Sequence, residues 1–314
     1  MTTHRILLVL LVLVGIVGII DRYRRKGIKG LMALWLPILL IVIVAYSILG
    51  WSLFFMQSSF LYRPVGPVLY DPSDVGLEFE KVHLETADSI KLVAWFTPAK
   101  DATITVLLCH GNGGNISHRL DTINLLNELG LNSLVFDYRG YGQSKGKTTE
   151  EGTYLDARAA WGWLVETKKT DPKNIILFGR SLGGSVAAKL ATDVEARGLV
   201  LESSFTSFID IGKKFYPYMP VKLFARFKYN TLQYLQQTDC PVLIVHSRGD
   251  EMIPFELGLR LYDAASEPKE FLEISGGHNE GFLSSGETYK QGWLTWLKFL
   301  EEYKKTAEPN LKIS

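Results

Sequence analysis

One serine in the sequence has neighbours that could make it reactive. Ser181 is the centre of Gly179-Arg180-Ser181-Leu182-Gly183, a G-x-S-x-G pattern. An apolar run typical of a strand, NIILF, precedes the pattern, and a run typical of a helix, LGGSVAAKLAT, follows it. A sharp turn from strand to helix would push the serine hydroxyl into solvent, and glycine permits such a turn because it has no Cβ. The pattern predicts a nucleophilic serine; the alternative is a glycine-rich turn with a capping serine.

A serine hydroxyl needs a base to take its proton, and the base needs an acid to orient it. In sites of this type the acid and then a histidine follow the serine along the chain. Of the six histidines, only His278 follows a late predicted strand, in SGGHNEGF. His246 also comes after the serine, but it precedes the only well-placed acid. We therefore expect His278 to be the general base, with a histidine of a surface loop as the alternative.

The acid that best fits this order is Asp250, in VLIVHSRGDEMIP. It lies just beyond a predicted buried strand and before a helix that begins at a proline. Glu251 is adjacent and could take its place. Asp239 precedes the strand, and Asp263 falls inside a predicted helix, so we expect neither to reach the serine.

Two backbone N–H groups are candidates for stabilising the negative charge that develops when a carbonyl is attacked. One belongs to Leu182, directly after the serine, and the other to Asn112, in the turn HGNGGN that follows the third predicted strand. The alternative for this turn is a loop that binds phosphate, but its spacing is not G-x-G-x-x-G. DYRGYG, residues 137–142, follows the next strand, and we expect it to support the HGNGGN turn rather than contact substrate.

The elements that must position these groups follow from the apolar pattern after residue 60. LEFEKVHLET and IKLVAWFTP alternate and predict an antiparallel pair at a sheet edge. Six further runs are typical of buried strands: TITVLLCHG, LNSLVFDYRG, KNIILFGRS, RGLVLESSF, CPVLIVHSRGD and KEFLEISGGH. Helices are expected near 116–129, 151–168, 182–193, 255–265 and 287–304. This alternation predicts the α/β class, with a doubly wound, mostly parallel sheet whose sites lie beyond the carboxyl ends of the strands.

Residues 206–240 interrupt that alternation. They are too long for a plain connection and rich in Tyr, Phe and Lys, so we expect a short helical lid. The stretch KKFYPYMPVKLFARFKYN mixes aromatic with basic side chains, a composition that suits contact with anionic headgroups and an acyl chain. The alternative is that its aromatic side chains pack on the domain.

The N-terminal sixty residues predict a membrane anchor. Residues 31–56 run for 26 positions without a charge, long enough for a transmembrane helix. Residues 6–20 form a shorter apolar run, and we favour a short first span over a signal or interfacial segment because no small-residue cleavage site follows. The linker 21–30 has five basic residues and one acid, which predicts a cytoplasmic linker and a periplasmic or otherwise exoplasmic large domain.

Composition narrows the possible partners. The chain has 34 basic and 33 acidic residues, but residues 61–314 alone have a net charge of −4. A mildly acidic domain without a Lys/Arg stripe argues against nucleic acid. Cys109 and Cys240 cannot form a disulfide framework, and no Cys/His cluster suggests zinc. We expect an integral protein of the cell membrane with no metal and no cofactor.

Five motifs together, HGNGGN, DYRGYGQS, GRSLGGSVA, HSRGDEMIP and GGHNEGF, resemble the α/β-hydrolase superfamily. The likeness is greatest to its membrane-tethered serine hydrolases, a branch that includes palmitoyl-protein and lysophospholipid hydrolases. FLYRPVGP resembles the start of the hydrolase domain in that branch, and the run 6–20 is not part of its pattern.

The resemblance covers roughly residues 58–300 and implies a domain organisation. We expect an anchor over 1–57, an α/β-hydrolase domain over 58–305 with its lid at 206–240, and a tail over 306–314. It also implies that Ser181 is the nucleophile, Asp250 the acid and His278 the base.

The residues and the resemblance together predict a metal-independent serine hydrolase. It would cleave small-molecule or lipid carboxylic esters or thioesters through an acyl-enzyme intermediate. One alternative is a serine peptidase of related fold, which usually carries an additional binding domain. Another is a non-catalytic membrane interaction protein, which would fit a degraded triad better than the intact one seen here.

Overall fold

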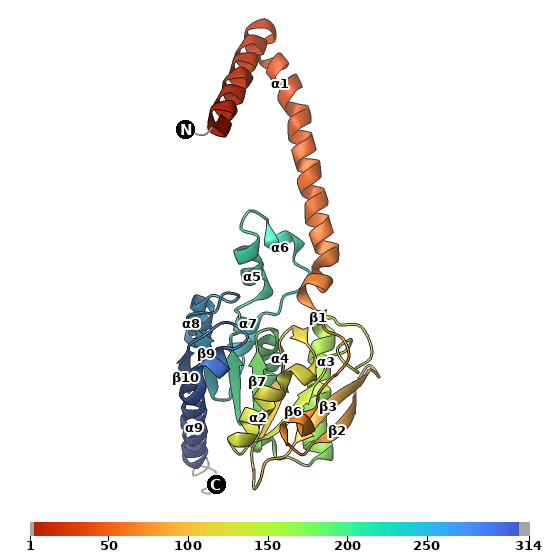
Figure 1. Ribbon diagram of the computed structural model, residues 1–314, viewed down its shortest axis with the longest axis vertical. Coiled ribbons are helices and arrows are strands. Elements are labelled where there is room, and N and C mark those ends of the chain that lie inside the picture. The colour runs from red at the N-terminus through yellow and green to blue at the C-terminus, as the bar shows by residue number, and fades with distance from the viewer. Residues whose placement is uncertain (1–2, 308–314) are drawn as a thin grey trace. The chain divides into compact units, whose positions relative to one another are not determined.

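The computed structural model describes residues 3–307 (Figure 1) and divides into two units between Met56 and Gln57. The first unit consists of most of α1 (Thr3–Leu61), which Gly27 breaks with φ 58° and ψ −156°. Such a backbone conformation suits glycine because it has no Cβ. Within the described residues, one helix, Trp35–Leu61, is long and apolar enough to cross a membrane.

Two of the sequence expectations fall at the ends of the described chain. The predicted first span, residues 6–20, lies largely outside the residues whose side chains are described, and it stays a prediction. The predicted tail, residues 306–314, lies almost wholly outside the described residues. The orientation of the chain across a membrane likewise stays a prediction.

The second unit is built on an eight-stranded sheet with the order β10-β9-β8-β7-β4-β6-β3-β2. The strands are β2 (Glu80–Glu85), β3 (Lys91–Thr97), β4 (Thr105–Cys109), β6 (Asn132–Phe136), β7 (Ile175–Arg180), β8 (Gly198–Glu202), β9 (Val242–Ser247) and β10 (Lys269–Ile274). Pairing is antiparallel from β2 to β3 and from β3 to β6, and parallel elsewhere. The predicted antiparallel edge pair and the mostly parallel sheet are both confirmed.

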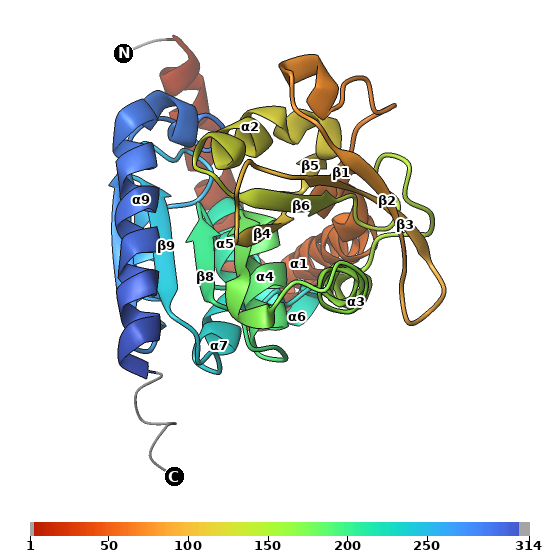
Figure 2. The ribbon, with the colours of Figure 1, turned by 90° about the horizontal axis from the view of Figure 1, so that it is seen from below.

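Helices cover both faces of this sheet, as a doubly wound fold requires (Figure 2). One face packs α2 (Leu120–Glu128) and α9 (Gly281–Ala307), and the other packs α3 (Glu150–Gly162), α4 (Leu182–Ala191), α7 (Thr231–Leu235) and α8 (Phe255–Ala264). Alternate side chains of β7 enter the two layers: Leu177 joins one core, while Ile176 and Phe178 join the other. This is why the central strands are apolar along most of their length.

Shorter elements complete the domain. They are β1 (Arg63–Pro64), β5 (Gly113–Gly114), the 3₁₀ turns η1 (Pro72–Val75), η2 (Ile116–Arg119) and η4 (Pro172–Asn174), and the π-helical turn η3 (Trp163–Thr167) that continues α3. β1 pairs with β5 in parallel, which joins the chain after α1 to the HGNGGN turn.

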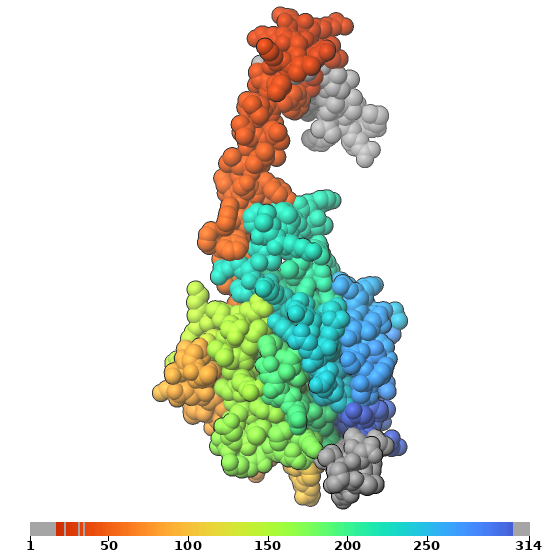
Figure 3. Space-filling model, turned by 180° about the vertical axis from the view of Figure 1, so that it is seen from behind, coloured from red at the N-terminus to blue at the C-terminus, as the bar shows by residue number. Residues whose placement is uncertain are grey.

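The stretch over 206–240 holds α5 (Phe208–Phe215) and α6 (Val221–Phe224) as well as α7. The region of α5 and α6 projects beyond the rest of the domain (Figure 3). Two hydrogen bonds hold it to Gln57, whose side-chain amide donates to the carbonyl of Phe224 over 2.6 Å and accepts from the N–H of Arg226 over 2.9 Å. The stretch is helical as expected, and its action as a lid stays a prediction.

Candidate active site

The backbone at Ser181 turns sharply between β7 and α4. Its φ of 55° and ψ of −119° are unusual for a residue with a side chain. A Cβ at Gly183 would lie 2.0 Å from the carbonyl oxygen of Cys109, and one at Gly179 would lie 2.3 Å from the carbonyl oxygen of Gly183. Both glycines are therefore needed for the chain to pass through this turn, which presents the serine hydroxyl at the carboxyl end of β7.

The structure joins three of the predicted residues in one hydrogen-bonded chain. Nε2 of His278 lies 3.0 Å from Oγ of Ser181, and its Nδ1 lies 2.7 Å from Oδ2 of Asp250. All three residues are buried, and each follows the carboxyl end of a different strand. Since a carboxylate can only accept, Nδ1 carries the hydrogen, and in the neutral form of the ring the lone pair of Nε2 faces the hydroxyl. The arrangement can transfer a proton from the hydroxyl to the ring.

Asp250 is held as a carboxylate by the loop after β9. Its Oδ1 accepts hydrogen bonds from the backbone N–H groups of Met252, over 2.9 Å, and Ile253, over 2.7 Å. Burial by itself would raise the pKa of Asp250, but the hydrogen bond and charge of His278 and the N–H of Ile253 outweigh it, and the pKa lies below its ordinary value. The group is therefore ionised at neutral pH.

Two alternatives from the sequence, Glu251 for the acid and His246 for the base, make other contacts. Glu251 accepts a hydrogen bond from the backbone N–H of His278 over 3.0 Å, and so supports the loop rather than the imidazole. His246 lies 3.7 Å from Oδ2 of Asp250, and its Nε2 donates to the carbonyl of Ile253 over 3.0 Å. Burial lowers the pKa of His246, so this ring is neutral and braces the loop.

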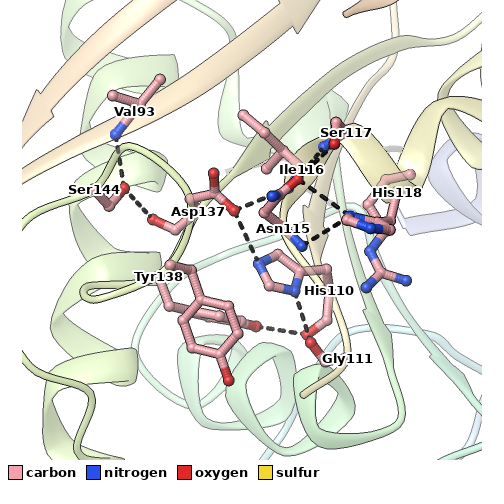
Figure 4. Close-up of polar contacts among 12 residues, drawn as sticks. Val93, His110, Gly111, Asn115, Ile116, Ser117, His118, Asp137, Tyr138 and Ser144 are labelled. Carbon is pink, nitrogen blue, oxygen red and sulfur yellow. Dashed lines mark hydrogen bonds and ion pairs between the residues drawn. The ribbon is translucent and has the colours of Figure 1, made fainter. Parts of the chain in front are cut away.

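The HGNGGN turn lies beside the serine. A Cβ at Gly111 would be 3.6 Å from Cβ of Ser181. Nδ1 of His110 donates to the carbonyl of Gly111 over 2.7 Å (Figure 4). Because C=O and N–H point in opposite directions across a trans peptide, this bond turns the N–H of Asn112 away from His110. The side-chain amide of Asn112 donates to the carbonyl of Leu61 over 2.8 Å, so this side chain is engaged with the end of α1.

Residues 137–142 support this turn from behind. The hydroxyl of Tyr138 donates to the carbonyl of His110 over 3.0 Å, and that of Tyr141 donates to the carbonyl of Asn112 over 2.8 Å. Oδ1 of Asp137 accepts from the N–H of Ile116 over 2.9 Å (Figure 4). Burial raises the pKa of Asp137 to about 7, while burial and the charge of Arg119 lower that of His110 to about 3. The expected supporting role of this segment is thus seen in its contacts.

Sequence reasoning missed the ion pair beneath the serine. Arg180 and Glu202 are partners in the register of β7 and β8, and Nε of Arg180 lies 2.7 Å from Oε1 of Glu202. The hydroxyl of Ser204 donates to the carbonyl of Ser181 over 3.1 Å. Two consecutive apolar strands that end in opposite charges were the available signal, because parallel neighbours bring their last residues together.

A cavity of about 390 Å³ opens at Ser181 and His278. Its remaining lining residues are Val65, Gly111, Asn112, Gly113, Gly114, His118, Arg119, Asp121, Arg180, Met252, Asn279, Phe282 and Leu283. Among the described residues, no group of three or more His, Cys, Asp and Glu side chains is placed to hold a metal ion.

Comparison with known proteins identifies relatives of this chain by sequence and by structure. Residues 100–238 match the family described as serine aminopeptidase, S33. The chain is 32% identical to the alpha/beta hydrolase domain-containing protein WAV2 of Arabidopsis thaliana, covering 79% of this chain and 88% of WAV2. It is 30% identical to the lysophosphatidylserine lipase ABHD12 of Danio rerio, covering 76% of this chain and 70% of ABHD12. The esterase Pf2001 of Pyrococcus furiosus has a similar structure, with a TM-score of 0.65 and 25% identity over 76% of this chain and 96% of the esterase.

Proposed function

The chain belongs to the α/β-hydrolase family, and on this premise we propose that it is a membrane-anchored serine hydrolase of carboxylic esters or thioesters. Its family and its likeness to an esterase and a lipase support hydrolysis of an acyl bond. The observation that carries the serine mechanism is the continuous chain of hydrogen bonds from Ser181 through His278 to Asp250, beside a cavity that Ser181 and His278 help to line.

In the proposed mechanism, Oγ of Ser181 attacks the acyl carbon while Nε2 of His278 takes its proton. Asp250 keeps the imidazole in the required tautomer and stabilises the imidazolium that forms. The imidazolium then protonates the leaving group, and an acyl-enzyme ester remains on Ser181. Water, activated by the same imidazole, attacks this ester and releases the acid.

The backbone N–H groups of Asn112 and Leu182 are the proposed oxyanion donors. That of Leu182 is the first in α4, and that of Asn112 is directed by the hydrogen bond from His110 to Gly111. Each donor of this kind contributes about 2.7–4 kcal/mol to stabilising the transition state. Because both are backbone groups, their effect depends on the shape of the turn rather than on one side chain.

An acyl ester suits the cavity. Val65, Met252, Phe282 and Leu283 give it apolar walls, which favour an acyl chain over a polar peptide. The peptidase alternative is kept because the matched family is described as a serine aminopeptidase. Comparing kcat/KM for an ester, a thioester and an aminoacyl anilide of similar size separates these reactions. A preference for the anilide would favour the peptidase.

The experiment that tests the proposal uses full-length protein in detergent and p-nitrophenyl esters of increasing acyl length. Ser181→Ala is expected to abolish hydrolysis. The matched control is Ser185→Ala, four residues further along the same helix, whose buried hydroxyl has no hydrogen-bond partner among the described residues. Loss of activity in Ser185→Ala, or its retention in Ser181→Ala, would contradict the proposal.

The proposed transmembrane helix and the projecting region of α5 and α6 suggest that the enzyme acts at a membrane surface. Trp35–Leu61 is the proposed transmembrane helix, and its last turns include Gln57, which bonds the segment around α6. That segment exposes 91% of Tyr218 and 75% of Leu223. We propose that it contacts the bilayer surface.

The bilayer contact is tested with one ester in vesicles and one in solution. Leu223→Asp should slow hydrolysis of the vesicle ester more than that of the soluble ester. Leu294→Asp, an exposed leucine on α9, is the control and should not. Equal effects of the two variants on the vesicle ester would contradict the contact.

The hydrolase domain is proposed to lie on the periplasmic or exoplasmic side. The proposal rests on the five basic residues of the linker 21–30, which favour a cytoplasmic position for that linker. Protease added to cells with a permeabilised outer layer and an intact cell membrane should digest the domain. Digestion only after the cell membrane is broken would place the domain in the cytoplasm.

A further inference from the structure

Arg119 lines the cavity of Ser181, and no carboxylate among the described residues lies within ion-pair distance of its guanidinium. Its Nη2 donates to the carbonyl of Gly113, in the HGNGGN turn. Its Nε is buried and has no hydrogen-bond partner among the described residues. Arg139 and Arg180, two buried arginines near this end of the sheet, both form close ion pairs, and within the described chain Arg119 forms none.

The surroundings of Arg119 balance its charge in part. The buried carboxyl of Asp137 interacts with the guanidinium from beyond ion-pair distance, and burial raises the pKa of this carboxyl to about 7, so it carries only part of a negative charge at neutral pH. Arg180 shares the cavity, but its own charge is balanced by Glu202. Asp121 is the one carboxylate among the described residues that line the cavity, and it lies at an exposed position outside ion-pair distance of Arg119. Burial and the charge of Arg180 lower the pKa of Arg119 to about 10, so the guanidinium is still cationic at neutral pH.

A partly buried, unpaired cation is costly, and proteins usually pair it. The cost is met when a ligand brings the opposite charge, and a guanidinium matches the planar edge of a carboxylate or the oxygens of a phosphate. The turn leaves room beside the guanidinium: Gly114 has φ 82°, and a Cβ there would lie 3.2 Å from Nη2 of Arg119.

We propose that Arg119 forms an anion subsite, and that the preferred substrate carries a carboxylate or phosphate group in addition to the bond that is cleaved. The inference rests on the proposed function, because it assigns a substrate class to the same cavity. Arg119 binds the anion and takes no part in proton transfer. The positive charge of Arg119 favours anionic esters over neutral esters that Ser181 would otherwise attack at similar rates.

Two matched substrate pairs test the subsite and separate its two sources of charge. The first is p-nitrophenyl butyrate against p-nitrophenyl hemisuccinate, which places a carboxylate on the acyl side. The second is a monoacylglycerol against the corresponding acylglycerol phosphate, which places a phosphate on the leaving group. The readout is the ratio of kcat/KM for the anionic ester to that for its neutral partner, measured on full-length protein in detergent.

Arg119→Gln is expected to lower this ratio by on the order of 10- to 100-fold in at least one pair, because it removes a charged hydrogen-bond donor. Arg119→Lys should restore part of the ratio, since it keeps the charge. The control is Arg158→Gln, an exposed arginine on α3, which should leave the ratio unchanged. High salt should lower the wild-type ratio and barely affect that of Arg119→Gln.

The outcomes separate the subsite from the proposed function. Hydrolysis of the neutral esters with the same ratio in wild type and Arg119→Gln would overturn the subsite and leave the hydrolase standing. Absence of hydrolysis of all four esters by folded wild-type protein would instead contradict the proposed function. A change confined to the acyl-side pair or to the leaving-group pair identifies which part of the substrate carries the charge.

Discussion

Strands β7 and β8 place Arg180 opposite Glu202, and their side chains form a buried ion pair of 2.7 Å beneath the turn that carries Ser181. Oε2 of Glu202 also accepts a hydrogen bond from the hydroxyl of Tyr289 on α9. The guanidinium of Arg180 stacks 4.1 Å from the ring centre of Phe282. The pair therefore ties the serine turn to the last helix of the domain.

Removing one charge of this pair should destabilise the domain. Glu202→Gln leaves Arg180 buried without its counter-charge, which typically costs about 3–5 kcal/mol of unfolding free energy. Denaturant unfolding of full-length protein in detergent measures the change. Glu273→Gln is the control, because it breaks an exposed ion pair with Arg248 and should have a much smaller effect. Equal losses of unfolding free energy in the two variants would show that the buried ion pair stabilises the domain no more than the exposed one.

The serine turn should not tolerate a methyl group at Gly183. A Cβ there would lie 2.0 Å from the carbonyl oxygen of Cys109, so Gly183→Ala requires β4 or α4 to move. We expect a loss of about 3 kcal/mol or more, together with loss of activity. Gly162→Ala, on α3, meets nothing closer than 3.9 Å and should stabilise by about 0.5–1 kcal/mol. A stable, active Gly183→Ala variant would contradict the geometry of the turn.

Asp250→Asn should lower kcat strongly without unfolding the protein. The amide cannot hold His278 in the tautomer that accepts a proton from Ser181, and a change of this kind lowers kcat by about 10⁴-fold. Hydrolysis of a short ester, followed together with the thermal midpoint, separates the chemical effect from a structural one. A kcat within tenfold of wild type at an unchanged midpoint would remove Asp250 from the proposed triad.

Asp137 should make stability depend on pH. Burial raises the pKa of its carboxyl from the ordinary value of 3.8 to about 7, so the folded protein keeps a proton that the unfolded chain releases. Protonated Asp137 therefore contributes to the free energy of unfolding in full below about pH 4. This stabilising contribution is lost as the pH rises to about 7. Asp137→Asn cannot ionise, and its Oδ1 can still accept from Ile116, so its stability should be flatter across this range.

The difference between the two proteins can reach at most about 4 kcal/mol over that interval. Unfolding free energies of wild type and Asp137→Asn at half-unit pH steps measure it. Parallel curves for the two proteins would mean that the buried carboxyl ionises as it does in water.

Much of the fold was predictable because each buried strand serves two cores at once. The run IILF in β7 is apolar throughout, since neighbouring side chains enter opposite layers, and that pattern distinguishes it from the amphipathic segments around it. That Ser181, Asp250 and His278 come together could also be predicted, because each follows such a run and their order along the chain fits a known pattern; their catalytic roles stay a prediction.

The contacts missed from sequence depend on geometry between distant segments. The pairing of Arg180 with Glu202 depends on the register of two strands, which the whole sheet determines. The position of Arg119 in the cavity depends on the path of a long side chain past Gly114. Neither the spacing of residues along the chain nor the periodicity of apolar residues shows which distant side chains come into contact.

Covalent labelling of the active site shows whether His278 activates Ser181. Full-length protein in detergent would be treated with a fluorophosphonate probe, and the modified peptide identified by mass spectrometry. We expect labelling of Ser181 in wild type, none in Ser181→Ala, and undiminished labelling in Ser185→Ala. Labelling at another residue, or no labelling of folded wild-type protein, would contradict this activation.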